Sequence, residues 1–138
     1  MRTDLLLRSF ALGFASGLRT MTGPTAVFRT AKWRVALPIM ALGEYVVDLL
    51  PQTPNRTDAG PLAARAIAGG LCGAAVAGDA GGNVLLCASA GSAGAIGAAY
   101  AGLSLRRWSA ERIPAAAAGL LEDGVAIGIA YLASRGRR

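Results

Sequence analysis

The sequence predicts an all-α membrane protein, a polytopic bundle of about five hydrophobic helices that forms one integral membrane domain over residues 1–138. Three observations lead to this fold class. Hydrophobic residues make up 54% of the chain and charged residues 16%, against about 25% charged residues in typical soluble domains. The apolar residues fall into five segments that polar or Gly/Pro-containing stretches separate. Glycine occurs 19 times, and small residues suit close helix–helix contact in lipid.

The first predicted helix covers residues 5–22 and ends at Gly23-Pro24, a pair that commonly stops helices. Within it, Gly13 and Gly17 form a G-x-x-x-G pair, which predicts a close helix contact.

The second predicted helix covers residues 35–50 and is short for a span, which needs roughly 20 residues. A basic and aromatic stretch at residues 29–34 precedes it and is typical of an interfacial anchor. The polar linker at residues 51–60 follows it and is expected to be stiff because it contains Pro51 and Pro54.

The third predicted helix covers residues 61–77, with Gly69 and Gly73 as a second close-contact pair. A tight turn is expected at residues 78–83, which include three glycines.

The fourth predicted helix covers residues 84–105 and ends at the boundary Arg106-Arg107-Trp108. Small residues recur at every fourth position along it and predict one packing stripe: Ala90, Gly94, Ala98 and Gly102. The fifth predicted helix covers residues 114–134.

Five spans would place the two termini on opposite sides of the membrane. The 14 basic residues then divide equally between the two sides, so the positive-inside rule assigns no orientation. A miscounted span and a dual-topology, antiparallel homodimer both account for that balance. We expect a multi-pass protein of the bacterial inner membrane, in contact with the lipid bilayer and assembled as a homodimer or higher homo-oligomer.

Other classes of protein are disfavoured by the composition. The arginines are scattered or lie at segment ends, and no basic stripe interleaved with aromatic residues predicts nucleic-acid binding. The chain has no histidine, and no cofactor is expected. Cys72 and Cys87 lack C-x-x-C or zinc spacing, which favours small buried residues over a redox pair.

Acidic residues inside the apolar segments are the main functional signal. Glu44 and Asp48 are four residues apart and would share one helix face, whereas the adjacent Glu122 and Asp123 would point roughly 100° apart. An ionised, unpaired carboxylate in lipid costs several kcal/mol, so it must be protonated, hydrated, paired with arginine or bound to a cation. For Arg19, snorkelling to the interface and inward pairing are both compatible with its position. The candidate ion- or substrate-binding residues are Glu44, Asp48, Glu122, Asp123, Arg19, Arg56 and Arg65.

A weak internal repeat is also present. Gly17-Leu18-Arg19 precedes the segment with Glu44, and residues 102–106, Gly-Leu-Ser-Leu-Arg, precede the segment with Glu122-Asp123. Transporters commonly bind their substrates between such repeats.

Four stretches in order carry a resemblance to a known family: residues 17–22 (GLRTMT), residues 43–56 (GEYVVDLLPQTPNR), Arg65 and residues 121–123 (LED). Together they resemble the bacterial membrane family called domain of unknown function 4126, over nearly the whole chain. The resemblance implies a small multi-pass membrane protein and no established activity. Where many members carry a lysine after the aspartate of the second stretch, this chain has Leu49.

The candidate residues are compatible with three functions. A transporter or channel for an ion or small solute would use the buried carboxylates and arginines along its path. A structural or partner-binding membrane subunit would use the same charges to fix helix register. A metal-dependent membrane enzyme would hold a lipid or polyprenyl phosphate between carboxylate-bound metal and arginines. Transport is the leading interpretation, and an enzyme is the least favoured.

Overall fold

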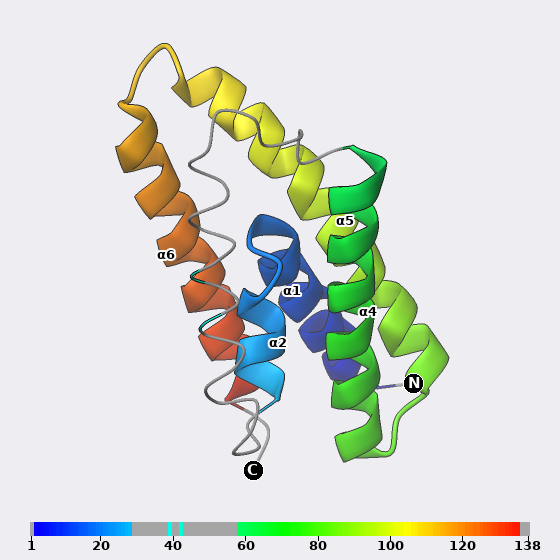
Figure 1. Ribbon diagram of the computed structural model, residues 1–138. Coiled ribbons are helices and arrows are strands. Elements are labelled where there is room, and N and C mark those ends of the chain that lie inside the picture. The colour runs from blue at the N-terminus through cyan, green and yellow to red at the C-terminus, as the bar shows by residue number, and fades with distance from the viewer. Residues whose placement is uncertain (1, 29–38, 40–41, 43–57, 136–138) are drawn as a thin grey trace.

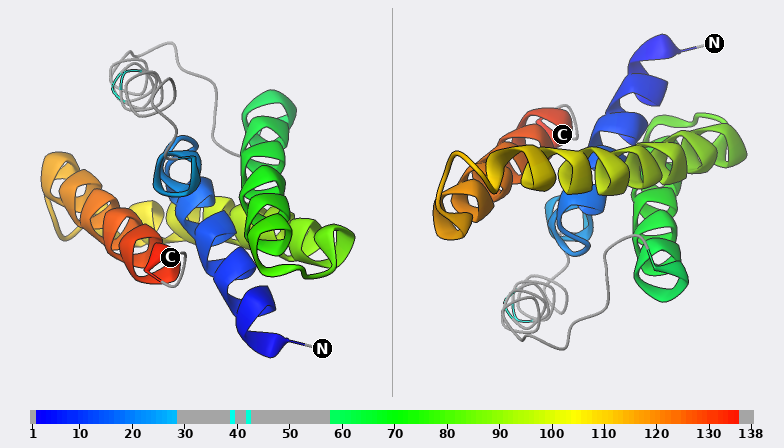
Figure 2. Two further views of the ribbon diagram at one scale, coloured as in Figure 1. Left: turned by 90° about the horizontal axis from the view of Figure 1, so that it is seen from below. Right: turned by 90° about the horizontal axis from the view of Figure 1, so that it is seen from above.

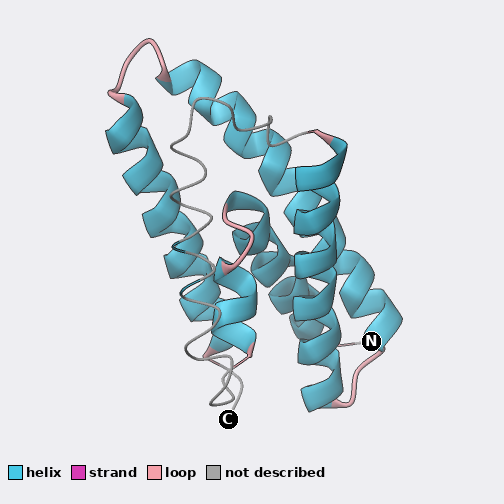
Figure 3. Ribbon diagram, viewed as in Figure 1, coloured by secondary structure: helices cyan, strands magenta, loops and turns pink. Residues whose placement is uncertain are grey.

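The computed structural model describes residues 2–28, 39, 42 and 58–135, and these residues form helices and short connections without any strand (Figures 1 and 3). Five helices have defined bounds: α1 (Thr3–Leu18), α2 (Thr22–Val27), α4 (Ala59–Ala80), α5 (Val84–Ser109) and α6 (Ala115–Ser134). The all-α prediction is therefore confirmed. The predicted helix at residues 35–50 lies outside the described residues, apart from the exposed Ile39 and Leu42.

Three of these helices are long and apolar enough to cross a membrane: α4 with 22 residues, α5 with 26 and α6 with 20. Their outward faces carry large apolar side chains, among them Leu85, Ile96, Leu120 and Ile127. Such a surface is unfavourable in water and favourable against hydrocarbon, where the helices also satisfy their own backbone hydrogen bonds. The protein is a membrane protein whose helices suit contact with a lipid bilayer.

Helix α1 is the buried centre of the bundle. It lies between α4 and α6, and α5 crosses it (Figure 2). Leu12 and Ala15 are completely buried, as are two serines, Ser9 and Ser16. At 16 residues α1 is shorter than the roughly 20 residues of a full span.

The predicted helix stop at Gly23-Pro24 is wrong in its position. Helix α1 ends earlier, at Leu18, because Arg19 adopts an extended conformation (φ −140°, ψ 116°). Gly23 and Pro24 instead occupy the first turn of α2, where proline is tolerated since its missing N–H would have no helical partner there. A side chain at Gly23 would overlap Ser16 of α1, so glycine allows α2 to fold back closely along α1.

The described chain differs from the expectation that five spans place the termini on opposite sides. Both ends of the described chain lie at the same end of the bundle, which we call the terminal end (Figure 1). Arg2 there donates a hydrogen bond of 3.2 Å to the carbonyl of Ala80, the last residue of α4. The opposite end, where α4 starts and α5 meets α6, is called the far end.

Small residues bring α5 into close contact with α1 and α4. A Cβ at Gly13 or Gly69 would overlap the backbone of Gly91, and a Cβ at Gly73 would overlap that of Cys87. Both predicted glycine pairs therefore pack on α5, and Gly91 serves both contacts. This confirms the glycine- and alanine-rich packing that the composition predicts.

The predicted stripe on α5 is correct for three of its four members. Gly94, Ala98 and Gly102 are buried, and Gly94 lies against the backbone of Phe10. Ala90 is only partly buried, because the contact with α4 uses the neighbouring position Gly91 instead.

Two predicted boundaries are too early. Helix α5 continues through Arg106-Arg107-Trp108 to Ser109, since arginine is compatible with a helix interior. Helix α4 continues to Ala80 and ends where Gly81 adopts the left-handed conformation, φ 65°, that favours glycine at helix ends.

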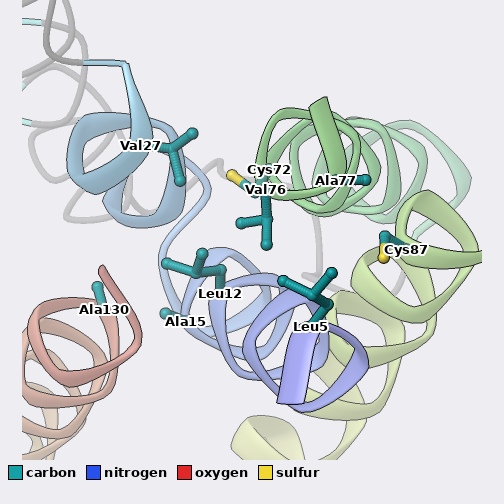
Figure 4. Close-up of a cluster of buried hydrophobic side chains, with 9 residues drawn as sticks. All are labelled: Leu5, Leu12, Ala15, Val27, Cys72, Val76, Ala77, Cys87 and Ala130. Carbon is teal, nitrogen blue, oxygen red and sulfur yellow. The ribbon is translucent and has the colours of Figure 1, made fainter. Parts of the chain in front are cut away.

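An apolar core fills the terminal end between α1, α2, α4, α5 and α6 (Figure 4). Leu5, Leu12, Val27 and Val76 are its larger members. Cys72 and Cys87 belong to the same core and are buried free thiols. This agrees with the prediction that they are small buried residues.

Replacement of Gly91 by alanine tests the shared contact. We expect Gly91→Ala to lower the free energy of unfolding by roughly 1–3 kcal/mol, because the new methyl group overlaps the backbone of Gly69. Gly97→Ala is the matched control on α5, where a Cβ meets nothing within 4 Å and the change should stay within about 1 kcal/mol. Unfolding in mixed detergent micelles measures both, and equal stability of the two variants would contradict the packing.

Candidate functional site

Arg19 and Asp123 form an ion pair inside the bundle. The Nε atom of Arg19 lies 2.5 Å from Oδ1 of Asp123, and the two side chains are 12% and 25% exposed. Because α1 ends at Leu18, Arg19 leaves the helix in an extended conformation and reaches the middle of α6. The two alternatives for Arg19 were snorkelling to the interface and inward pairing, and the structure shows inward pairing.

Glu122 and Arg106 form a second ion pair. Nε of Arg106 donates a hydrogen bond of 2.9 Å to Oε2 of Glu122. The Glu122 side chain is 3% exposed and that of Arg106 is 41% exposed. Since adjacent helical residues point roughly 100° apart, Asp123 faces the end of α1 while Glu122 faces α5.

Arg65 approaches the same region from α4. Its Nε donates a long hydrogen bond of 3.4 Å to the hydroxyl of Thr20, the residue that follows Arg19. Arg65 is only 4% exposed, and it makes at least one further interaction. A buried guanidinium needs several acceptors, so the end of α1 and the first turns of α4 are held together by polar contacts as well as by packing.

These contacts join the turn after α1 with the helices α4, α5 and α6 into what we call the charged layer. Its members are Arg19, Thr20, Arg65, Arg106, Glu122 and Asp123. Asp123 is the ninth residue of the 20-residue α6, and Arg65 is the seventh of the 22-residue α4. The layer thus lies within the lengths of two membrane-crossing helices, at the turn between α1 and α2.

The structure brings together four of the residues that the sequence nominated: Arg19, Arg65, Glu122 and Asp123. The other three nominated residues, Glu44, Asp48 and Arg56, lie outside the described part of the chain.

Two members of the charged layer were missed by reasoning from sequence. Arg106 was assigned to a membrane boundary, and Thr20 was not singled out. The internal repeat contained a signal for Arg106, because it matches Arg106 to Arg19, and each arginine pairs with one of the adjacent acids of α6. That signal did not show which acid each arginine would meet.

The charged layer consists of salt-bridged and hydrogen-bonded side chains rather than a cluster of acidic ligands. Among the described residues, no three His, Cys, Asp or Glu side chains lie close enough together to hold a metal ion. The arrangement holds charges of both signs inside the bundle.

Fold and site together define a polytopic α-helical membrane protein with charged residues inside its bundle. Comparison with protein-family models, with curated proteins and with solved structures finds no match for this chain.

Substitution of Glu122 tests whether its ion pair stabilises the bundle. We expect Glu122→Gln to lower the free energy of unfolding by about 1–3 kcal/mol, because a neutral amide replaces the charged acceptor of Arg106. Glu111→Gln is the control, since Glu111 is an exposed acid in the connection between α5 and α6. Thermal unfolding in detergent measures both variants, and a shift no larger for Glu122→Gln than for Glu111→Gln would refute the role.

Proposed function

We propose that the protein transports an ion or small solute across a membrane and that the charged layer lies on the solute's path. The observation that carries this proposal is the position of the layer, at an irregular turn between two helices within the depth of the bundle. Non-helical backbone at membrane depth is tolerated where it is buried in protein or lines a watery cavity. In transporters, sites near mid-membrane are typically built at such interrupted helices.

The graded exposure of the layer also supports transport. The side chains of Arg106 and Asp123 are 41% and 25% exposed, whereas that of Glu122 is 3% exposed. A charged path needs groups that water or a solute can reach, next to groups that hold them in position.

A structural role is the second candidate, because Glu122 and Asp123 each form a direct ion pair with an arginine. Such pairs can fix the register of α1 and α5 against α6 without any solute. Helix packing alone could use apolar residues at lower cost, which favours the first proposal.

The family and the setting belong to the same proposal. Membership of the domain of unknown function 4126 family rests on the four sequence stretches that resemble it. A bacterial inner-membrane location and a homo-oligomeric state are proposed with it. None of these assigns a substrate.

Charge exchange between Arg19 and Asp123 separates transport from a structural role. We expect Asp123→Asn to lower flux at least about tenfold in proteoliposomes, since it removes a partly exposed ionisable group from the proposed path. The double variant Arg19→Asp/Asp123→Arg should fold but not recover flux, because it re-forms the ion pair with the two charges exchanged. The probes are a luminal pH dye under an imposed proton gradient and tracer sodium, potassium and chloride.

Glu111→Gln is the control for surface charge and should leave flux unchanged. Equal leak through wild type and Asp123→Asn, for every ion tested, would remove the transport proposal. Full recovery of both folding and flux in the double variant would favour the structural role instead.

A further inference from the structure

We propose that α1 and α2 form a re-entrant hairpin, which enters and leaves the membrane at the terminal end, and that water reaches the charged layer at its tip only from the far end. This inference rests on the membrane location of the helices. It concerns how the layer is reached, and it holds whether or not a solute crosses.

The lengths of the two helices carry the first step. At 1.5 Å per residue, the 16 residues of α1 extend about 24 Å and the 6 residues of α2 about 9 Å. Both are shorter than the roughly 30 Å hydrocarbon core. Helix α2 then runs back toward the terminal end instead of continuing across (Figure 1). The pair therefore enters the membrane without crossing it.

The position of the tip carries the second step. Arg19 pairs with Asp123, which lies eight residues after Ala115, the first residue of α6. That separation corresponds to about 12 Å along the helix. Thr20 likewise contacts Arg65, six residues after the start of α4. The tip thus stops well short of the far end of both neighbouring helices.

The packing on the two sides of the tip differs, which carries the third step. Toward the terminal end, the apolar core closes the space between α1, α2, α4 and α6 with residues that are at most 5% exposed, such as Leu12, Val27 and Val76. Toward the far end, none of the residues 115–121 of α6 or 59–64 of α4 is buried. The apolar core therefore closes the terminal side of the tip, whereas no buried side chain of these two segments closes its far side.

Cysteine labelling of the full chain in vesicles tests both parts of the proposal. The background has Cys72→Ala and Cys87→Ala. Single cysteines then replace exposed residues at the two ends of the bundle, in Arg2→Cys and Arg135→Cys at the terminal end and Glu111→Cys at the far end. Vesicles holding at most one protein each are captured through a tag after the C-terminus, so that every captured protein has its C-terminus outside. A membrane-impermeant maleimide is supplied either outside or inside.

The hairpin predicts that Arg2→Cys and Arg135→Cys label only from outside and Glu111→Cys only from inside. Labelling of Arg2→Cys from inside would mean that α1 belongs to a conventional span, and the hairpin would be refuted. These three positions are exposed and outside the charged layer, so their labelling does not depend on any transport activity.

Access to the tip is measured with Thr20→Cys, and Met21→Cys repeats the measurement at the adjacent residue in case Thr20→Cys does not fold. Labelling from inside alone is expected. Labelling from outside, or protection from both sides at both positions, would overturn one-sided access. A negative flux assay combined with the expected labelling would remove the transport proposal and leave this inference intact.

Discussion

The cost of holding ionised groups away from water is the constraint on which the rest of this structure depends. Arg19, Arg65 and Glu122 lie inside a bundle whose outer surface is apolar, and unpaired charges there would cost several kcal/mol each. Glu122 is paired with Arg106, and for Arg19 and Arg65 the end of α1 at Leu18 reduces this cost. The extended residue that follows turns its guanidinium toward α6, and the next residue offers a hydroxyl to α4.

Close packing of backbones makes that arrangement possible. Gly13 and Gly17 let α1 approach α5 more closely than any larger side chain would allow. Gly91 does the same for α4. With α1 held against α5 in this way, the position of its C-terminal end is set by helix contacts, and the charged groups need only complete a geometry that packing already defines.

Helix type and most helix positions could be predicted from the sequence because they follow from local patterns. Apolar segments of spanning length and glycines four residues apart each have one dominant structural meaning. Gly23-Pro24 does not, since proline ends one helix and begins another equally well. Which of the two occurs depends on whether the following segment can pack against α1. Here it can, because Gly23 has no side chain that would overlap Ser16.

The candidate site was predictable in its residue types and not in its pairings. Mid-segment acids and nearby arginines can be identified by hydropathy alone. Which arginine meets which acid depends on the rotation of α6 and on where α5 ends, and both are tertiary properties. Arg106 shows this. At a segment boundary it would face water, but α5 continues to Ser109, and from within the helix Arg106 reaches Glu122.

The two adjacent acids of α6 differ in how readily they could exchange partners. Glu122 is almost fully buried, so separating it from Arg106 would leave a carboxylate where water cannot easily solvate it. Asp123 is one-quarter exposed and pairs with an arginine on an irregular turn rather than on a helix, so water or a solute can replace that partner at lower cost. Under the transport proposal, Glu122 and Arg106 position α6, and Asp123 with Arg19 is the pair that opens. A purely structural network does not require such a difference between the two pairs.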